Sequence, residues 1–257
     1  MLVDYHIHAA AHGENRYSLE WMNLFLEKAR QEGIKELGFS EHDEFINLMD
    51  YQVFEQIKME WSRKITVRLG IEVDYIPGRE PEIKSLIQQN PYDYVIGSVH
   101  FIDGWGFDHP DYREGFNQRD IDDIYGSYAK ILLQMSQTRS FDIVGHIDLV
   151  KIWGHRPQKH SSLYYLEPVL KSIKYYDLAV EINSAGLRKE VKEIYPAADI
   201  ADRLYQYDIP ITFGSDAHNP DQTGEGLTDA YQCARRAGYR YLVRFEKRQK
   251  IYTPMNG

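Results

Sequence analysis

The chain starts with MLVDYHIH (residues 1–8), a short apolar run that ends in two histidines with one residue between them. Six similar runs follow along the chain: IKELGFSEH (34–42), ITVRLGIEV (65–73), YDYVIGSVH (92–100), FDIVGHID (141–148), LAVEINS (178–184) and IPITFGSDAH (209–218). Runs of this length and residue type are typical of strands that are buried on both faces. The repeated pattern therefore predicts seven buried strands.

Segments with a helical pattern separate these runs. Between residues 18 and 32, apolar residues recur at helical spacing, with Ser18 suited to cap the start and Gly33 the end. The same kind of pattern predicts helices at 50–62, 80–89, 119–138, 162–176 and 197–207. Strands that alternate with helices imply a parallel sheet, and seven of them suggest an α/β barrel close to the eight-fold form.

Composition limits the classes of function. The 257 residues are 43% hydrophobic, which is enough for one large core, and the formal net charge is −9. A protein that binds duplex nucleic acid needs a basic stripe, which this acidic chain does not supply. The single cysteine, Cys233, excludes an internal disulfide and a cysteine-rich metal site. With no apolar run near the roughly 20 residues that span a bilayer, we expect a soluble cytoplasmic protein, as a monomer or homodimer.

Histidines and acidic residues recur at the ends of the predicted strands. They are His6, His8, His42, Glu72, His100, His146, Asp216 and His218. In a parallel barrel the carboxyl ends of all strands meet at one face, which is where such folds place their active sites. Side chains alternate along a strand, so His6 and His8 point the same way. His12 follows a turn and can fold back over the same face. Asp4 and Asp74 are interpreted as structural or as supports for ligands.

These residue types point to a metal site. Imidazoles and carboxylates without thiolates suit Zn, Mn or Fe rather than Ca or Mg. Eight donors, or nine if His12 joins, are too many for one tetrahedral ion, so we expect two or three ions with Glu72 and Asp216 able to bridge. Taken singly, each histidine could be an ordinary hydrogen-bonded residue at a strand end. Their recurrence at equivalent positions favours a shared metal site.

Several longer motifs match a known family. They are HIH (6–8), FSEHDEF (39–45), GIEVDY (70–75), GSVHFIDGWGFDHP (97–110), VGHIDLVKIWGHRP (144–157), EINSAGLRKEVKEIYP (181–196) and GSDAHNP (214–220). With these motifs the chain resembles the polymerase-and-histidinol-phosphatase (PHP) superfamily, and within it the monofunctional histidinol-phosphate phosphatases. The motifs occur in the family's order and cover nearly the whole chain, which implies a single domain over 1–257.

The resemblance implies a distorted (β/α)7 TIM-like barrel that holds three divalent ions. Carried over by position, the first ion would be held by His6, His8, Glu72 and Asp216; the second by Glu72, His100 and His146; and the third by His12, His42 and His218. The implied activity is hydrolysis of L-histidinol phosphate to L-histidinol and phosphate in histidine biosynthesis. Our hypothesis for the chemistry is attack on phosphorus by a hydroxide that bridges two ions.

Groups that would bind the substrate can also be proposed. Arg156 and Arg188 follow the fifth and sixth strands, and a guanidinium matches two phosphate oxygens; the alternative is two surface arginines. Histidinol phosphate also carries an ammonium and an imidazole, which need acidic or aromatic partners. We expect Asp43 and Trp105, the latter in the aromatic loop 101–118, to contribute them, although such a loop could simply pack over the barrel rim.

Other functions stay open at this point. The site could act on another small phosphate ester, or it could belong to a phosphodiesterase or nuclease, against which the acidic balance weighs. A metal-binding protein without catalysis is the third alternative. A storage or structural site needs no phosphate clamp, so the two arginines favour an enzyme.

Overall fold

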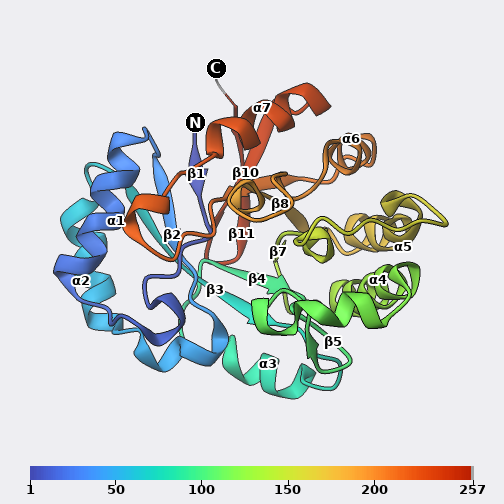
Figure 1. The fold of residues 1–257 in the computed structure, drawn as a ribbon. Helices are drawn as coiled ribbons and strands as arrows, with labels where there is room; N and C mark the ends of the chain where they lie inside the picture. Colours follow the sequence, from blue (N-terminus) through green and yellow to red (C-terminus); the bar gives the residue numbers. More distant parts are fainter. Residues whose placement is uncertain (256–257) are drawn as a thin grey trace.

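The computed structural model describes residues 1–255, and seven parallel strands form a ring at its centre (Figure 1). In spatial order they are β1 (Val3–Asp4), β2 (Glu36–Phe39), β3 (Thr66–Asp74), β4 (Tyr94–Ser98), β7 (Ile143–Val144), β8 (Ala179–Asn183) and β9 (Ile211–Gly214). The last strand returns to the first: the Tyr5 amide donates to the Phe213 carbonyl at 3.0 Å, and the His8 amide to the Ala217 carbonyl at 2.8 Å. The sheet is thereby nearly closed, and the predicted (β/α)7 barrel is confirmed.

Helices surround this ring in chain order (Figure 1). They are α1 (Leu19–Gln31), α2 (Tyr51–Trp61), α3 (Glu80–Leu86), α4 (Ile121–Gln137), α5 (Ser162–Tyr175), α6 (Ala198–Gln206) and α7 (Leu227–Ala237). Ser18 caps α1 as predicted, because its hydroxyl accepts from the Trp21 amide at 3.1 Å. Gly33 has a φ of +74°, which suits a glycine just past a helix end. The apolar pattern predicts the first six helices and misses α7, which holds the buried Cys233.

The strands end sooner than the apolar runs do. β1 covers only Val3–Asp4, although the run extends to His8. Beyond the ladder, isolated bridges join Ile7 to Ala217 and His42 to Glu72. Five short 3-10 helices then turn the chain at this rim: η1 (Ala11–Gly13), η2 (Asp43–Leu48), η4 (Leu149–Lys151), η5 (Ala185–Leu187) and η6 (Pro220–Gln222). The polar residues that follow each strand therefore lie at the carboxyl rim of the barrel.

Tyr94 fills the middle of the barrel. A Cβ atom on Gly38 would lie 2.0 Å, and one on Gly70 2.2 Å, from atoms of the Tyr94 side chain, so only glycine leaves room for the ring. The ring stacks on Tyr5 with centroids 4.7 Å apart, and its hydroxyl donates to the Tyr5 carbonyl at 2.7 Å. This packed layer separates the carboxyl rim from the amino end of the barrel.

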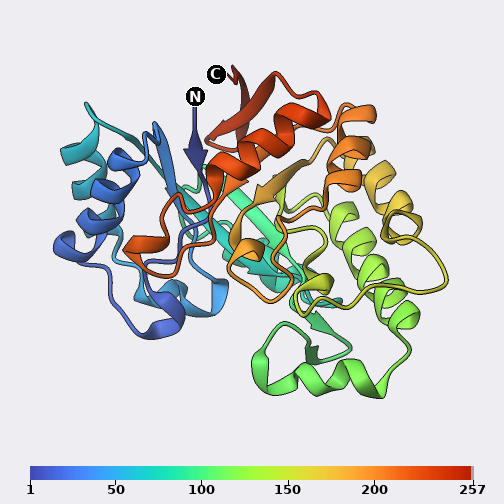
Figure 2. The same cartoon turned by 45° about the horizontal axis from the view of Figure 1, so that its top comes forward.

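A terminal hairpin covers the amino end. It consists of β10 (Tyr241–Glu246) and β11 (Gln249–Pro254) and lies beside the start of the chain in Figure 2. The Phe245 amide donates to the Tyr5 hydroxyl at 3.1 Å, and Arg244 donates to the buried Glu36 at 2.7 Å. The hairpin thus closes one end of the barrel and leaves the other end for the site.

A second small hairpin stands at the side of the barrel. It is formed by β5 (Phe101–Ile102) and β6 (Trp105–Gly106) and leads into η3 (Pro110–Gln118), which projects from the ring of helices in Figure 2.

Within residues 1–255, every helix is too short or too polar to cross a membrane.

Candidate metal centre

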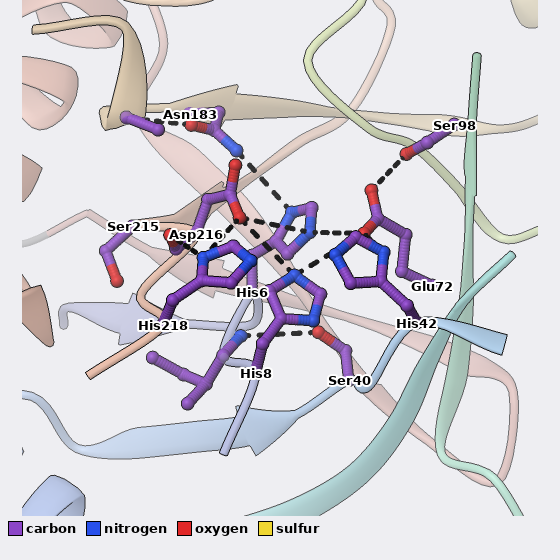
Figure 3. A network of polar contacts seen from close by, with 12 residues as sticks. His6, His8, Ser40, His42, Glu72, Ser98, Asn183, Ser215, Asp216 and His218 are labelled. Carbon is purple, nitrogen blue, oxygen red and sulfur yellow. Dashed lines mark hydrogen bonds and ion pairs between the residues drawn. The ribbon is translucent and has the colours of Figure 1, made fainter. Parts of the chain in front are cut away.

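Imidazoles and carboxylates from six strand ends come together at the carboxyl rim. Figure 3 shows six of these residues: His6, His8, His42, Glu72, Asp216 and His218. Glu72, near the end of β3, lies at the centre of the cluster with an exposed fraction of 1%. Its Oε2 atom is 2.9 Å from His42 Nδ1, 3.2 Å from His6 Nε2 and 3.4 Å from His8 Nε2. One carboxylate oxygen therefore faces three imidazoles, two from the segment after β1 and one from the segment after β2.

The second oxygen of Glu72 faces the opposite side of the cluster. Oε1 lies 3.1 Å from His146 Nε2 and 3.8 Å from His100 Nε2, and it accepts from the Ser98 hydroxyl at 2.5 Å. The ring of His100 is held in turn by Asp74, whose Oδ1 is 2.5 Å from His100 Nδ1. Asp74 is thus a support for a candidate ligand, as interpreted from the sequence.

Asp216 completes the cluster from the turn after β9. Its Oδ1 lies 3.3 Å from His8 Nε2, 3.6 Å from His218 Nδ1 and 3.9 Å from His6 Nε2. The residue has a φ of +54°, in the left-handed region that non-glycine residues seldom adopt. This backbone conformation places the carboxylate beside three candidate ligands.

His12 reaches the cluster through its ring. The ring centroids of His12 and His218 are 4.3 Å apart, and those of His12 and His42 are 5.0 Å apart. His12 lies in η1 with a φ of +56°, which folds the chain back toward the rim. The structure therefore brings His12 to the side of the cluster where the sequence places it.

The donor atoms form four groups whose members lie within 4.8 Å of one another. They are His6, His8 and Glu72; His6, His146 and Asp216; Glu72, His100 and His146; and His8, His42 and His218. The third of these groups coincides with the donor set predicted for the second ion. The fourth contains His8 where the sequence-based set has His12, so the distribution of donors among ions stays a prediction.

The cluster has the properties expected of a cation site. Within residues 1–255, several buried polar atoms at the rim make no hydrogen bond: His6 Nε2, both ring nitrogens of His8, His42 Nε2, Glu72 Oε2, His146 Nδ1 and His218 Nε2. Each such atom costs about 1–3 kcal/mol when it is left without a partner. So many at one point are accounted for by ions that they bind, and nitrogen and oxygen donors suit Zn, Mn or Fe.

Electrostatics keep the carboxylates ionised. Burial would raise the pKa of Glu72, but the neighbouring His6 and His42 outweigh it and hold that pKa well below its usual value. The pKa of Asp216 is likewise held well below its usual value, because His6 and His8 outweigh the effect of burial. Burial, together with His42, lowers the pKa of His8 well below that of a free imidazole. Anionic carboxylates and a neutral imidazole are the forms that bind metal.

The model of the PHP domain matches residues 4–185, which is more than half of the chain. The chain belongs to the PHP family. The resemblance drawn from the sequence motifs is thereby confirmed, and the multinuclear character of the donor cluster agrees with it.

Curated relatives carry one name. The probable histidinol-phosphatase of Deinococcus radiodurans is 35% identical over 190 residues, which is 74% of this chain and 72% of the relative. The histidinol-phosphatase of Bacillus subtilis is 28% identical over 86% of this chain and 95% of its own length. The solved structure of histidinol phosphate phosphatase from Lactococcus lactis, in complex with zinc, L-histidinol and phosphate, has a TM-score of 0.79 at 21% identity, with 97% of this chain and 98% of that chain covered. This last likeness establishes the fold.

Arg188 of this PHP protein lies directly beside the cluster. Its Nη2 atom donates to the backbone carbonyls of Ser215 at 2.6 Å and Asp216 at 3.1 Å. Its Nη1 atom is buried, lies 3.6 Å from Glu225 and makes no hydrogen bond within the described residues. Arg188 lines a cavity of about 580 Å³ together with His12, Asp216 and His218. The guanidinium therefore has a donor available next to the predicted metal site.

Arg156 is placed differently. Its Nη2 atom is 2.5 Å from a Glu193 carboxylate oxygen, and its Nη1 atom donates to the His155 carbonyl at 3.3 Å. Its side chain is 43% exposed. Of the two predicted phosphate ligands, Arg188 is held at the cluster, whereas Arg156 is held by an acidic partner.

The two other predicted substrate residues are held by internal contacts. Asp43 accepts from Arg79 at 2.7 Å and from the Asp74 amide at 3.3 Å. Trp105 packs against Phe116 with ring centroids 4.8 Å apart and donates to the Tyr112 carbonyl at 2.9 Å. Their roles in binding substrate stay predictions.

One buried carboxylate at the site escaped the sequence analysis. Glu181 lies in the middle of β8, and its Oε1 atom is 2.7 Å from His6 Nδ1. The available signal was an acidic residue inside the apolar run LAVEINS (178–184), the one run of the seven from which the sequence predicts no metal ligand.

Proposed function

We propose that this PHP protein is a metal-dependent histidinol-phosphatase that hydrolyses L-histidinol phosphate to L-histidinol and phosphate in histidine biosynthesis. The observation that carries the proposal is the convergence of buried, unpartnered imidazole nitrogens on Glu72 and Asp216, within the described residues, at the active face of a PHP barrel. The names of the curated relatives support the choice of substrate. A small-molecule substrate also agrees with the net charge of −9, which disfavours nucleic acid.

The proposed cofactor is a set of two or three divalent ions, Zn, Mn or Fe. When bound, such ions neutralise phosphoryl oxygens and supply a water of lowered pKa. We assign the donors as the sequence predicts: His6, His8, Glu72 and Asp216 to one ion; Glu72, His100 and His146 to a second; and His12, His42 and His218 to a third. Glu72 and Asp216 each face imidazoles on more than one side, so they are the residues suited to bridging.

Arg188 would hold the phosphoryl group. Its Nη2 contacts to two carbonyls fix the guanidinium, and the free Nη1 hydrogens can donate to a phosphate oxygen. Arg156 would first have to leave Glu193 before it could bind the phosphate, so we assign it a smaller contribution to phosphate binding. Both residues bind and orient charge; neither takes up a proton.

The organic part of the substrate needs an acidic or aromatic wall. Asp43 would meet the ammonium while it shares its carboxylate with Arg79, and Trp105 would line the pocket from the projecting loop. The proposal also places the reaction in the cytoplasm and treats the protein as a monomer or homodimer, without contact to a membrane.

A phosphate-release assay tests the proposal. The purified protein is stripped of metal, reloaded with Zn, Mn or Fe, and given L-histidinol phosphate, a panel of other small monoesters and single-stranded DNA. We expect activity only after reloading, with the highest kcat/KM on L-histidinol phosphate. Preference for another monoester would overturn the substrate, cleavage of DNA would favour a nuclease, and inactivity on every substrate at full metal loading would leave only metal binding.

A further inference from the structure

β8 differs from the other six strands of the barrel. Within residues 1–255, it is the strand that neither contains a member of the four donor groups nor has one shortly after its end. Its inward-facing Glu181 is nevertheless 1% exposed and touches the centre of the site. A buried carboxylate needs partners, and the identity of these partners shows what it does.

Both oxygens of Glu181 accept from groups that belong to candidate ligands. Oε1 is 2.7 Å from His6 Nδ1, and Oε2 accepts from the backbone amide of His146 at 3.1 Å. Oε2 also accepts from the Asn183 side-chain amide at 3.0 Å. His6 and His146 are two of the three members of one donor group, with Asp216 as the third. Glu181 therefore connects two ligand positions, one just after β1 and one just after β7, across the barrel interior.

The neighbouring strands leave space for this carboxylate. A Cβ atom on Gly214 of β9 would lie 1.9 Å from Glu181 Oε1 and 2.6 Å from the Cβ of His6. Any larger residue there would displace Glu181 or His6. The glycine at this position is explained by the close approach of the two side chains.

The contact also decides which nitrogen of His6 can bind an ion. An ionised carboxylate only accepts hydrogen bonds, so Nδ1 must carry the proton. In the neutral ring, which is the form that binds metal, Nε2 is then left with its lone pair; this atom lies 3.2 Å from Glu72 Oε2, is buried and makes no hydrogen bond in the described part of the chain. Carboxylate partners of ligating histidines elsewhere fix the tautomer and the ring in this way.

We propose that Glu181 is a positioning residue of the metal centre, which fixes the tautomer and ring of His6 and the backbone at His146 so that both present their donors to the bound ions. This inference rests on the metal-binding part of the proposed function and is independent of the substrate. Asp74 holds His100 in the same manner, so two of the candidate ligands have a carboxylate in contact with ring nitrogen Nδ1.

The test compares Glu181→Gln with Glu36→Gln. Glu36 is also fully buried but lies at the amino end of the barrel, bound by Arg68 and Arg244. Metal-free proteins are titrated with Zn²⁺ against a chromophoric chelator, bound ions are counted by mass spectrometry, and Tm is measured without metal. A glutamine amide can accept at only one of the two oxygen positions, so we expect Glu181→Gln to lose about 10–100-fold in zinc affinity. Glu36→Gln should stay within about threefold of wild type even where its Tm falls.

The outcomes separate a failure of the positioning role of Glu181 from a failure of the proposed function. Zinc affinity of Glu181→Gln close to wild type, or an equal loss in both variants, would overturn the positioning role. If wild type itself bound none of Zn, Mn or Fe, the metal-binding part of the proposed function would fail instead. Should Glu181→Gln not fold, ¹⁵N NMR of the imidazoles in zinc-loaded wild type still tests the proposal: His6 must keep its proton on Nδ1 and bind zinc through Nε2, and the reverse arrangement would overturn it.

Discussion

The two ends of this barrel each bury a glutamate, and the two glutamates differ in what surrounds them. At the amino end, Glu36 is completely buried and accepts from Arg68 at 2.8 Å, from Arg244 at 2.7 Å and from the Tyr5 hydroxyl. At the carboxyl end, Glu72 is just as buried, but Oε2 faces imidazoles and makes no hydrogen bond in the described residues. The first carboxylate is neutralised by arginines, which stay positively charged, whereas the second is surrounded by imidazoles, whose nitrogens can bind a cation.

The difference separates a structural charge from a functional one. Buried charges are tolerated when they are paired and hydrogen-bonded, and the guanidiniums around Glu36 meet both conditions. Imidazoles around Glu72 can be neutral, so they offer lone pairs rather than positive charge. Burial and distance alone would not distinguish the two glutamates. They are distinguished because Glu72 Oε2 makes no hydrogen bond within the described residues.

The largest effect is expected for Glu72→Gln. The substitution keeps the shape of the side chain but removes the charge shared by five imidazoles. We expect loss of bound metal and a fall in kcat/KM on L-histidinol phosphate of about 10³-fold or more. Phosphate release and a metal count measure both. Activity within tenfold of wild type at full metal loading would show that Glu72 is a structural charge like Glu36.

The two arginines should differ by an order of magnitude. Because Arg188 lies at the cluster, Arg188→Lys loses the fork that spans Ser215, Asp216 and the phosphate, and we expect kcat/KM to fall about 10–100-fold. Arg156→Lys, in a residue already paired with Glu193, should fall less than about tenfold. Steady-state kinetics on both variants decide the order. A larger loss in Arg156→Lys would mean that Arg156 leaves Glu193 and becomes the main phosphate ligand.

At the amino end the same kind of change should affect stability alone. Arg244→Met leaves Glu36 with one fewer partner, and we expect the free energy of unfolding to fall by about 1–3 kcal/mol. The specific activity of the folded protein should be unchanged, because the Tyr94 layer lies between this network and the site. Chemical denaturation and kinetics on the same preparation test both parts. A fall in kcat/KM without loss of stability would show that the two ends are coupled.

Local sequence patterns predict some features of the two ends and miss others. The strand ends carry their histidines at equivalent positions in a repeated pattern, so the barrel and the members of the cluster were predictable from local runs. The partners of Asp43 and Glu181 were not. Arg79 lies 36 residues from Asp43, and His6 lies 175 residues from Glu181, so both contacts depend on how the barrel closes. Likewise, the division of donors among ions depends on distances of a few ångströms that residue spacing does not encode.

The smallest predicted effect is the release of protons when zinc binds. In the metal-free protein, burial lowers the pKa of His6, but the carboxylates of Glu181, Glu72 and Asp216 outweigh it and raise that pKa well above the usual value. The pKa of His100 is raised in the same sense, chiefly by Asp74, against the effect of burial. Burial instead lowers the pKa of His218 to about 4. The pKa of His42 is also raised, by Glu72 against the effect of burial. The raised pKa values of His6, His42 and His100 favour protonated rings, which must lose a proton to bind metal, whereas the lowered pKa of His218 favours a neutral ring.

Zinc binding should consequently release protons, and zinc affinity should fall as the pH is lowered. Calorimetric titration at pH 7 in buffers of different ionisation enthalpy measures the release. Asp74→Asn provides the matched control: without that carboxylate the pKa of His100 falls, so about one proton fewer should be released. A binding enthalpy that did not vary with the buffer would mean that the imidazoles at the rim are already neutral. Asp74 and Glu181 would then orient the rings of His100 and His6 without holding protons on them, and Glu72, unlike Glu36, would have no cationic partner until metal binds.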